Sequence, residues 1–95
     1  MAQEDVKKHV DGLLKQFSSG IEILYTLPID KYPENERTAL RILKKLGVVR
    51  DSIVPEENVI TYKATKRYLD LVREDRVDAL SPLIVGEIKK YISFQ

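Results

Sequence analysis

Four basic residues recur at helical spacing in the middle of the chain: Arg37, Arg41, Lys44 and Lys45. The pattern i, i+4, i+7, i+8 places them on one face of a helix. Arginine can pair bidentately with guanine, and lysine suits phosphate as a flexible point charge. Asn35, which could read adenine, and Thr38 lie near the N-terminal end of this helix, the end that reaches base edges in DNA. A solvated outer helix face is the simpler interpretation of the same charges.

Positive charge is concentrated around this helix. The net charge of the 95 residues is +1, but residues 31–67 hold nine lysines and arginines against five acids, a net +4. The remainder holds seven bases and ten acids, a net −3. The overall charge therefore does not indicate nucleic-acid binding, whereas this segment would attract a polyanion.

The flanking residues predict further elements. Apolar residues at helical spacing predict a helix over about 4–18, and the basic helix should span 34–46 and stop at Gly47. Residues 48–54 and 59–64 are rich in β-branched side chains and predict two strands, joined by a polar turn over 55–58. Thr65 should cap a fourth helix, and Ser81-Pro82 should open the last one.

The segment 21–27 is ambiguous. Its β-branched and aromatic content suits a strand, but its apolar residues also fit a short helix that ends before Pro28. We predict a helix, because a helix-turn-helix needs a helix before the basic one. Residues 29–33 would then form the turn.

The stretch A-L-R-I-L-K-K-L-G-V-V, with the later I-T-Y-K-A-T-K-R-Y-L-D-L-V, resembles the winged helix-turn-helix DNA-binding family. PadR-like regulators and small archaeal plasmid or viral proteins belong to it. The resemblance covers about 40 residues and implies a recognition helix, a wing and a closing helix. It implies base-reading roles for Asn35, Arg37, Thr38 and Arg41. It implies DNA-backbone contacts for Lys31, Lys44, Lys45, Arg50, Lys63 and Lys66.

Two residues or motifs depart from the family pattern. Tyr68 stands where family members usually have glycine, three positions after the threonine. The predicted hairpin tip, Pro55-Glu56-Glu57, is acidic where a DNA-contacting wing is usually basic. Glutamates repel phosphates, so we expect any wing contact to come from the strands rather than from the tip.

The last helix has more apolar residues than one buried stripe requires: Leu83, Ile84, Val85, Ile88, Tyr91, Ile92 and Phe94. Excess apolar surface on a terminal helix suggests a seam between subunits. The predicted homodimer interface comprises Val6, Val10, Leu13, Phe17, Ile84, Ile88, Tyr91 and Ile92. The alternative is that both helices only cover the core of the monomer.

Several classes of function are not expected. The chain has no cysteine, and its single histidine, His9, has no second ligand at metal-binding spacing. Phosphate-cradling glycine loops and nucleophile motifs are absent, so we expect neither an enzyme nor a cofactor. No apolar run approaches the roughly 20 residues that span a bilayer, and the acidic start does not resemble a signal peptide. We expect a cytoplasmic protein without membrane contact, and the composition leans towards a thermophilic source.

The predicted fold is mainly α with a small β-hairpin, a winged helix-turn-helix over 1–75. Residues 76–95 would add a C-terminal dimerisation helix within the same single domain. The leading hypothesis is a homodimeric regulator of transcription that binds double-stranded DNA and reads a pseudo-palindrome with helix 34–46. A plasmid-segregation or architectural DNA-coating protein is an alternative on the same fold. A winged-helix protein-interaction module is the alternative from another class.

Overall fold

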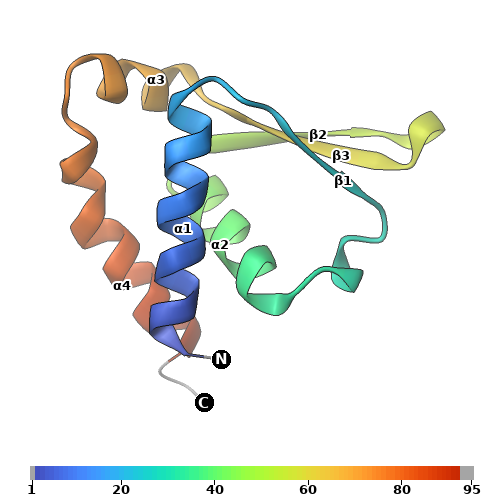
Figure 1. The fold of residues 1–95 in the computed structure, drawn as a ribbon, viewed down its shortest axis with the longest axis horizontal. Helices are drawn as coiled ribbons and strands as arrows, with labels where there is room; N and C mark the ends of the chain where they lie inside the picture. Colours follow the sequence, from blue (N-terminus) through green and yellow to red (C-terminus); the bar gives the residue numbers. More distant parts are fainter. Residues whose placement is uncertain (1, 93–95) are drawn as a thin grey trace.

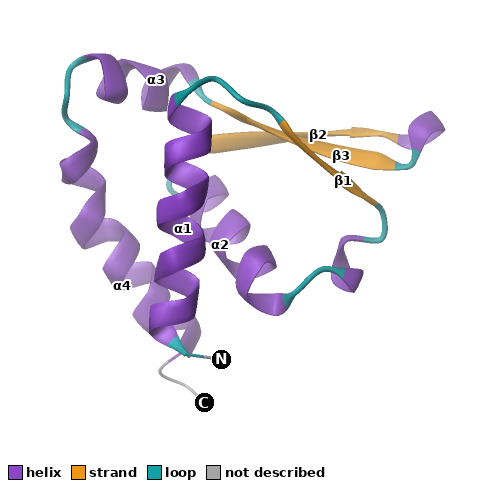
Figure 2. Ribbon diagram, in the orientation of Figure 1, coloured by secondary structure: helices purple, strands orange, loops and turns teal. Residues whose placement is uncertain are grey.

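The computed structural model describes residues 2–92, and these residues are mainly helical with one small sheet (Figures 1 and 2). The four helices are α1 (Gln3–Ser18), α2 (Glu34–Lys45), α3 (Lys66–Arg73) and α4 (Ser81–Ile92). The strands are β1 (Ile23–Thr26), β2 (Val49–Val54) and β3 (Val59–Ala64). Single 3-10 turns are η1 (Ile29–Lys31), η2 (Pro55–Glu57) and η3 (Val77–Leu80). The helices predicted over 4–18 and 34–46, the helix after Thr65, the last helix and the hairpin are confirmed.

The prediction of a helix over 21–27 is wrong, because residues 23–26 form an edge strand. β1 pairs antiparallel with β3, and the strand order is β1-β3-β2. The register places Tyr25 opposite Ile60, more than thirty residues later in the chain. This partner is remote in sequence, so local periodicity could not reveal the pairing. The single 3-10 turn η1 lies within residues 29–33, which were predicted to form the turn before α2.

The molecule is flat, with extents of 38 × 36 × 17 Å. In Figure 1, α1 lies in front of α2, α4 runs beside both helices, and the sheet projects away from them. The core between these elements draws on every helix and every strand. Its most enclosed side chains are Tyr68, Phe17, Leu40, Ile42, Leu43, Ile84, Val6, Val10 and Val48.

Gly47 joins α2 to the sheet. Its φ of +77° lies in the left-handed region, where glycine carries no Cβ penalty. The Gly47 N–H donates to the Lys44 carbonyl, and the Val48 N–H donates to the Leu43 carbonyl, which closes the helix. Thr65 Oγ1 then donates to the Gly47 carbonyl at 2.6 Å, tying this joint to the start of α3. The joint therefore sets how β2 lies beside the end of α2.

The sheet has two different faces, because successive side chains of a strand alternate. The inner face turns Tyr25, Val49, Ile60 and Tyr62 into the core. The outer face carries the alternate positions, which are polar or exposed for much of their length: Arg50, Ser52, Thr61, Lys63 and Leu24.

Candidate nucleic-acid interface

The basic residues of α2 form a ridge on its solvent-facing side. Arg41, Lys44 and Lys45 are exposed and Arg37 is half-buried, whereas Ala39, Leu40, Ile42 and Leu43 are buried. We call Arg37, Arg41, Lys44 and Lys45 the α2 ridge. The sequence prediction that these four cations share one face is thus confirmed by the geometry.

Arg37 is held in place by the loop that precedes α2. Its Nε donates to the Tyr32 carbonyl at 2.9 Å. The Tyr32 hydroxyl accepts the Thr26 N–H at 2.9 Å, and its ring packs edge-on against Tyr25 with 4.9 Å between centroids. Tyr25 in turn donates to Glu36 on α2 at 3.0 Å. These contacts fix the position of one ridge arginine before any ligand binds.

A groove of about 320 Å³ runs between the ridge and the sheet. Arg37, Arg41 and Lys44 form one wall, and Tyr62 and Asp51 contribute to the other. Ile29, Asp30 and Leu40 complete the lining. Burial raises the pKa of the Tyr62 hydroxyl, which is therefore neutral at physiological pH. The groove is mixed in charge, with three cations and two carboxylates.

Three ridge cations already have neighbours within the chain. Lys44 Nζ lies 2.8 Å from the Asp51 carboxylate, and this hydrogen bond raises the pKa of Lys44. The Arg41 guanidinium lies over the Tyr91 ring, 6.0 Å from its centroid. A phosphate approaching Lys44 would have to displace a carboxylate.

Lys45 makes the third such contact, with Glu87 of α4. Its Nζ lies 3.1 Å from Glu87 Oε2, while Lys90 donates to Glu87 Oε1 at 3.2 Å. The Glu87 side chain is only 9 % exposed, and Lys45 is the main cause that lowers its pKa. Glu87 thus stays ionised and holds Lys45 towards α4. Glu87 lies far from Lys45 in the sequence, so local sequence patterns could not predict this contact.

Two of the four residues predicted to read bases do not lie on the α2 ridge. Thr38 is only 7 % exposed, so its side chain belongs to the core and cannot reach a base edge. Asn35 lines a separate groove between α1 and α2, together with Asp5, His9 and Gln16. It lies two positions from Arg37, and residues two apart point to opposite sides of a helix. Only Arg37 and Arg41 of this set lie on the ridge.

The predicted backbone-contacting residues do not form one surface either. Arg50 and Lys63 lie on the outer face of the sheet, whereas Asp51, between them and Lys44, points to the inner side. Lys31 lies over the Tyr32 ring at 5.6 Å, and Lys66 is the exposed first residue of α3. Lys44 and Lys45 remain on the ridge. The alternation of side chains along β2 and β3 places Arg50 and Lys63 on the opposite face of the sheet from the ridge. This alternation could have been predicted from the sequence.

The predicted dimer interface is wrong for six of its eight residues. Val6, Val10, Leu13 and Phe17 of α1, and Ile84 and Ile88 of α4, are buried in the chain's own core. A side chain already covered by its own chain offers no surface to a second copy. Tyr91 and Ile92 are half-buried, and Phe94 lies outside the described residues. The exposed apolar residues of α4 are instead Leu83, at 50 %, and Val85, at 40 %.

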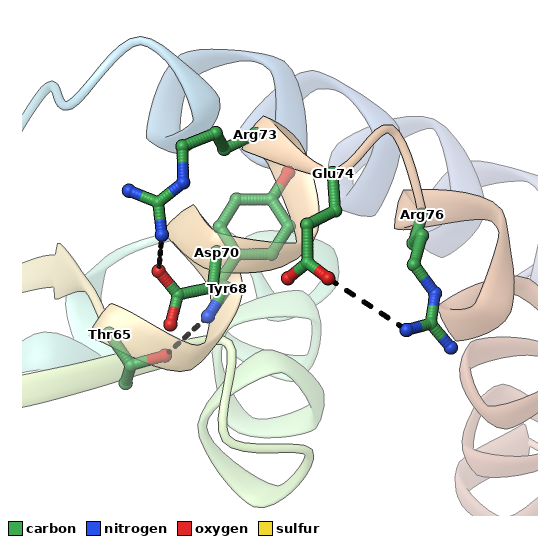
Figure 3. A network of polar contacts seen from close by, with 6 residues as sticks. All are labelled: Thr65, Tyr68, Asp70, Arg73, Glu74 and Arg76. Carbon is green, nitrogen blue, oxygen red and sulfur yellow. Dashed lines mark hydrogen bonds and ion pairs between the residues drawn. The ribbon is translucent and has the colours of Figure 1, made fainter.

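Charged residues in α3 and just after it form ion pairs with one another. Arg73 pairs with Asp70, and Arg76 lies 3.9 Å from Glu74 (Figure 3). Thr65 accepts the Tyr68 N–H, which confirms the predicted cap, and the Tyr68 hydroxyl donates to the Leu14 carbonyl at 2.8 Å. Tyr68 thus anchors α3 to α1 at the position where the family pattern has glycine.

No family model, no curated protein and no solved structure matches the chain. Within residues 2–92, no group of three histidine, cysteine or acidic side chains is arranged to hold a metal ion. The helices in this part of the chain are also too short or too polar to cross a membrane.

Proposed function

We propose that the protein binds double-stranded DNA through the α2 ridge. The observation that carries the proposal is the row Arg37, Arg41 and Lys44, which is presented to solvent along a groove in the free protein. Arginines in this arrangement can pair with guanine edges, and the lysine can contact phosphate. The Tyr32 contact reduces the side-chain entropy that Arg37 would lose on binding.

The order of elements supports a winged-helix type of DNA-binding protein. A helix, a strand, a second helix and a β-hairpin follow one another, and β1 pairs beside the hairpin. In this proposal α2 is the recognition helix and the β2–β3 hairpin is the wing. Glu56 and Glu57 are exposed at the hairpin tip, where they would repel phosphates. DNA would therefore be contacted by α2 rather than by the tip.

We infer a homodimeric regulator of transcription as the biological form of this activity. One ridge offers few base contacts, and two copies about 34 Å apart would read two half-sites of a pseudo-palindrome. With six predicted interface residues in the core, Leu83 and Val85 are the exposed large apolar side chains that the described part of α4 offers for self-association. A plasmid-segregation or architectural protein would use the same ridge, and would spread along DNA beyond one footprint.

Substitution of both ridge arginines tests the proposal. The double variant Arg37→Ala/Arg41→Ala should lose sequence-specific binding, by about 5- to 150-fold for each arginine that pairs with a base. The measurement is a gel shift against DNA fragments from the protein's own genomic neighbourhood. Weaker, sequence-independent binding through the remaining cations should persist and should fall steeply with salt.

The matched control removes two exposed cations from α1 instead. Lys8→Ala/Lys15→Ala changes the net charge equally but lies on α1, whose packing partner is the buried side of α2. This variant should bind specific DNA within about twofold of the wild type. Equal affinity of the ridge variant, the control and the wild type would disprove the proposed site. Thermal unfolding of each variant shows whether the fold is retained.

A protein-interaction module is the second candidate, and one observation favours it. Lys44 and Lys45 are neutralised by Asp51 and Glu87, and a surface of alternating charges suits a protein partner as well as DNA. Under this alternative the affinity for DNA would be weak and independent of sequence, and the ridge variant would lose a protein partner instead.

A further inference from the structure

The outer face of the sheet carries a second cationic surface. Cross-strand register sets Arg50 of β2 directly opposite Lys63 of β3, and Ser52 opposite Thr61 in the next row. These four side chains and Glu22 line a groove of about 440 Å³. We call this set the outer sheet site. Asp51 also borders the groove, but its carboxylate is engaged by Lys44 on the inner side.

Like charges directly opposite each other destabilise an antiparallel pair. Within residues 2–92, neither Arg50 nor Lys63 has a carboxylate within ion-pair distance. Other cations of the same molecule do have one: Lys7, Lys44, Lys45, Arg73, Arg76 and Lys90. Glu22 lines the same groove but lies beyond ion-pair distance of both cations, so an anion placed between Arg50 and Lys63 would relieve the remaining repulsion.

We propose that the outer sheet site binds the phosphate backbone of a second DNA segment, so that one chain can bridge two duplexes. The spacing of phosphates along a strand suits two neighbouring cations, and the Ser52 and Thr61 hydroxyls can donate to phosphate oxygens. Exposed Leu24, at 59 %, lies in the same row as Thr61 and could contact a sugar. In this proposal Arg50 and Lys63 contact phosphates and not base edges, so binding would be independent of sequence.

The geometry assigns this surface to a second segment rather than to the one on α2. α2 packs against the inner face of the sheet, so the outer face points away from the helix that carries the ridge. The edge strand β2 lies between the two surfaces. The inference rests on the proposed function only for the class of ligand, because the two sites share no cation, although Asp51 borders both grooves.

A bridging assay tests this site. Wild-type protein is loaded on an immobilised duplex of about one helical turn, roughly 10 base pairs, and capture of a second, fluorescent duplex is measured. The variant Arg50→Ala/Lys63→Ala should lose at least about 80 % of the captured fluorescence. Its affinity for a single specific duplex should stay within about twofold of the wild type. Bridging that survives in this variant, as a dimer with two α2 ridges would produce, overturns the inference.

Substitution of Glu22 should change capture of the second duplex in the opposite direction. It lies on the rim of the groove and would repel phosphate, so Glu22→Gln should increase capture of the second duplex. The control Lys8→Ala/Lys15→Ala should leave capture unchanged. An increase after Glu22→Gln is an effect that misfolding would not produce. No change in capture after either Glu22→Gln or the Arg50/Lys63 substitution would refute the site.

The two proposals fail in different ways. If Arg37→Ala/Arg41→Ala leaves single-duplex binding intact while Arg50→Ala/Lys63→Ala abolishes it, the α2 function falls and the outer sheet site remains as the DNA-binding surface. If both double variants weaken the same one-to-one complex and no second duplex is captured, the outer sheet site is part of one interface and the bridging proposal is overturned. Capture of an acidic protein in place of DNA also overturns it.

Discussion

The α2 ridge and the outer sheet site differ in how the chain treats their positive charges. On the ridge, Lys44 and Lys45 contact carboxylates and Arg41 lies over an aromatic ring. On the sheet, Arg50 and Lys63 lie opposite each other with no carboxylate within ion-pair distance in the described part of the chain. Two of the four ridge cations are thus paired with carboxylates in the free protein, whereas within residues 2–92 neither sheet cation is.

This difference predicts different energetics for the two surfaces. A phosphate that binds Lys44 or Lys45 must displace Asp51 or Glu87, which costs part of the Coulomb energy, so the position of the two arginines should decide affinity. A phosphate on the sheet replaces repulsion by attraction without breaking an ion pair. The ridge should therefore favour selectivity, and the outer sheet site should favour salt-sensitive, unselective binding.

The largest effect on the ridge is expected from a change at the joint between α2 and β2. Gly47→Ala forces a Cβ into a left-handed conformation and should lower the free energy of unfolding by about 1–2 kcal/mol. It should also weaken binding at the ridge, because this joint fixes the end of α2 that carries Lys44 and Lys45. Chemical denaturation and DNA titration well below the melting temperature measure the two effects.

Gly20→Ala is the matched control for that change. Gly20 has the same φ of +77°, and its N–H donates to the Phe17 carbonyl at the end of α1. The loss of stability should be similar, but DNA binding should not change, since Gly20 lies outside both proposed surfaces. A parallel loss of binding in both variants would show that stability alone accounts for it.

A smaller effect is expected when the carboxylate of Asp51 is removed from beside the ridge. Asp51→Asn removes the ion pair with Lys44, and exposed pairs of this kind contribute about 0.2–1 kcal/mol. DNA affinity should therefore rise by about 1.4- to 5-fold, with a small loss of stability. Fluorescence anisotropy with a labelled duplex measures this gain. Weaker binding would show that Asp51 orients Lys44 rather than competing with phosphate.

The smallest effect is expected from a change of charge on the outer face of the sheet. Lys63→Glu places a carboxylate opposite Arg50 and should raise the free energy of unfolding by about 0.5 kcal/mol. Lys63→Ala should give part of that gain, because it removes the repulsion alone. Both variants should lose capture of a second duplex. Destabilisation by Lys63→Glu, measured in the same denaturation experiments, would contradict the unrelieved repulsion.

Local sequence signals predicted the helices well and the sheet only in part. The apolar spacing around Val6 and Leu43 and the caps at Thr65 and Gly47 act within a few residues, so their elements formed where expected. The strand around Tyr25 depends on hydrogen bonds to residues 59–62 and was predicted as a helix. Thr38 was predicted to read bases, but its place on α2 turns it into the core.

The sequence by itself determined which helices form and that Arg37, Arg41, Lys44 and Lys45 share one face, because helical periodicity is a local property. Only the tertiary structure decided which of these cations contact a carboxylate or a ring, since Glu87 and Tyr91 belong to α4, which is distant from α2 in the sequence. It also decided that the apolar stripes of α1 and α4 cover the chain's own core. Such outcomes depend on packing between distant segments, which no local pattern records.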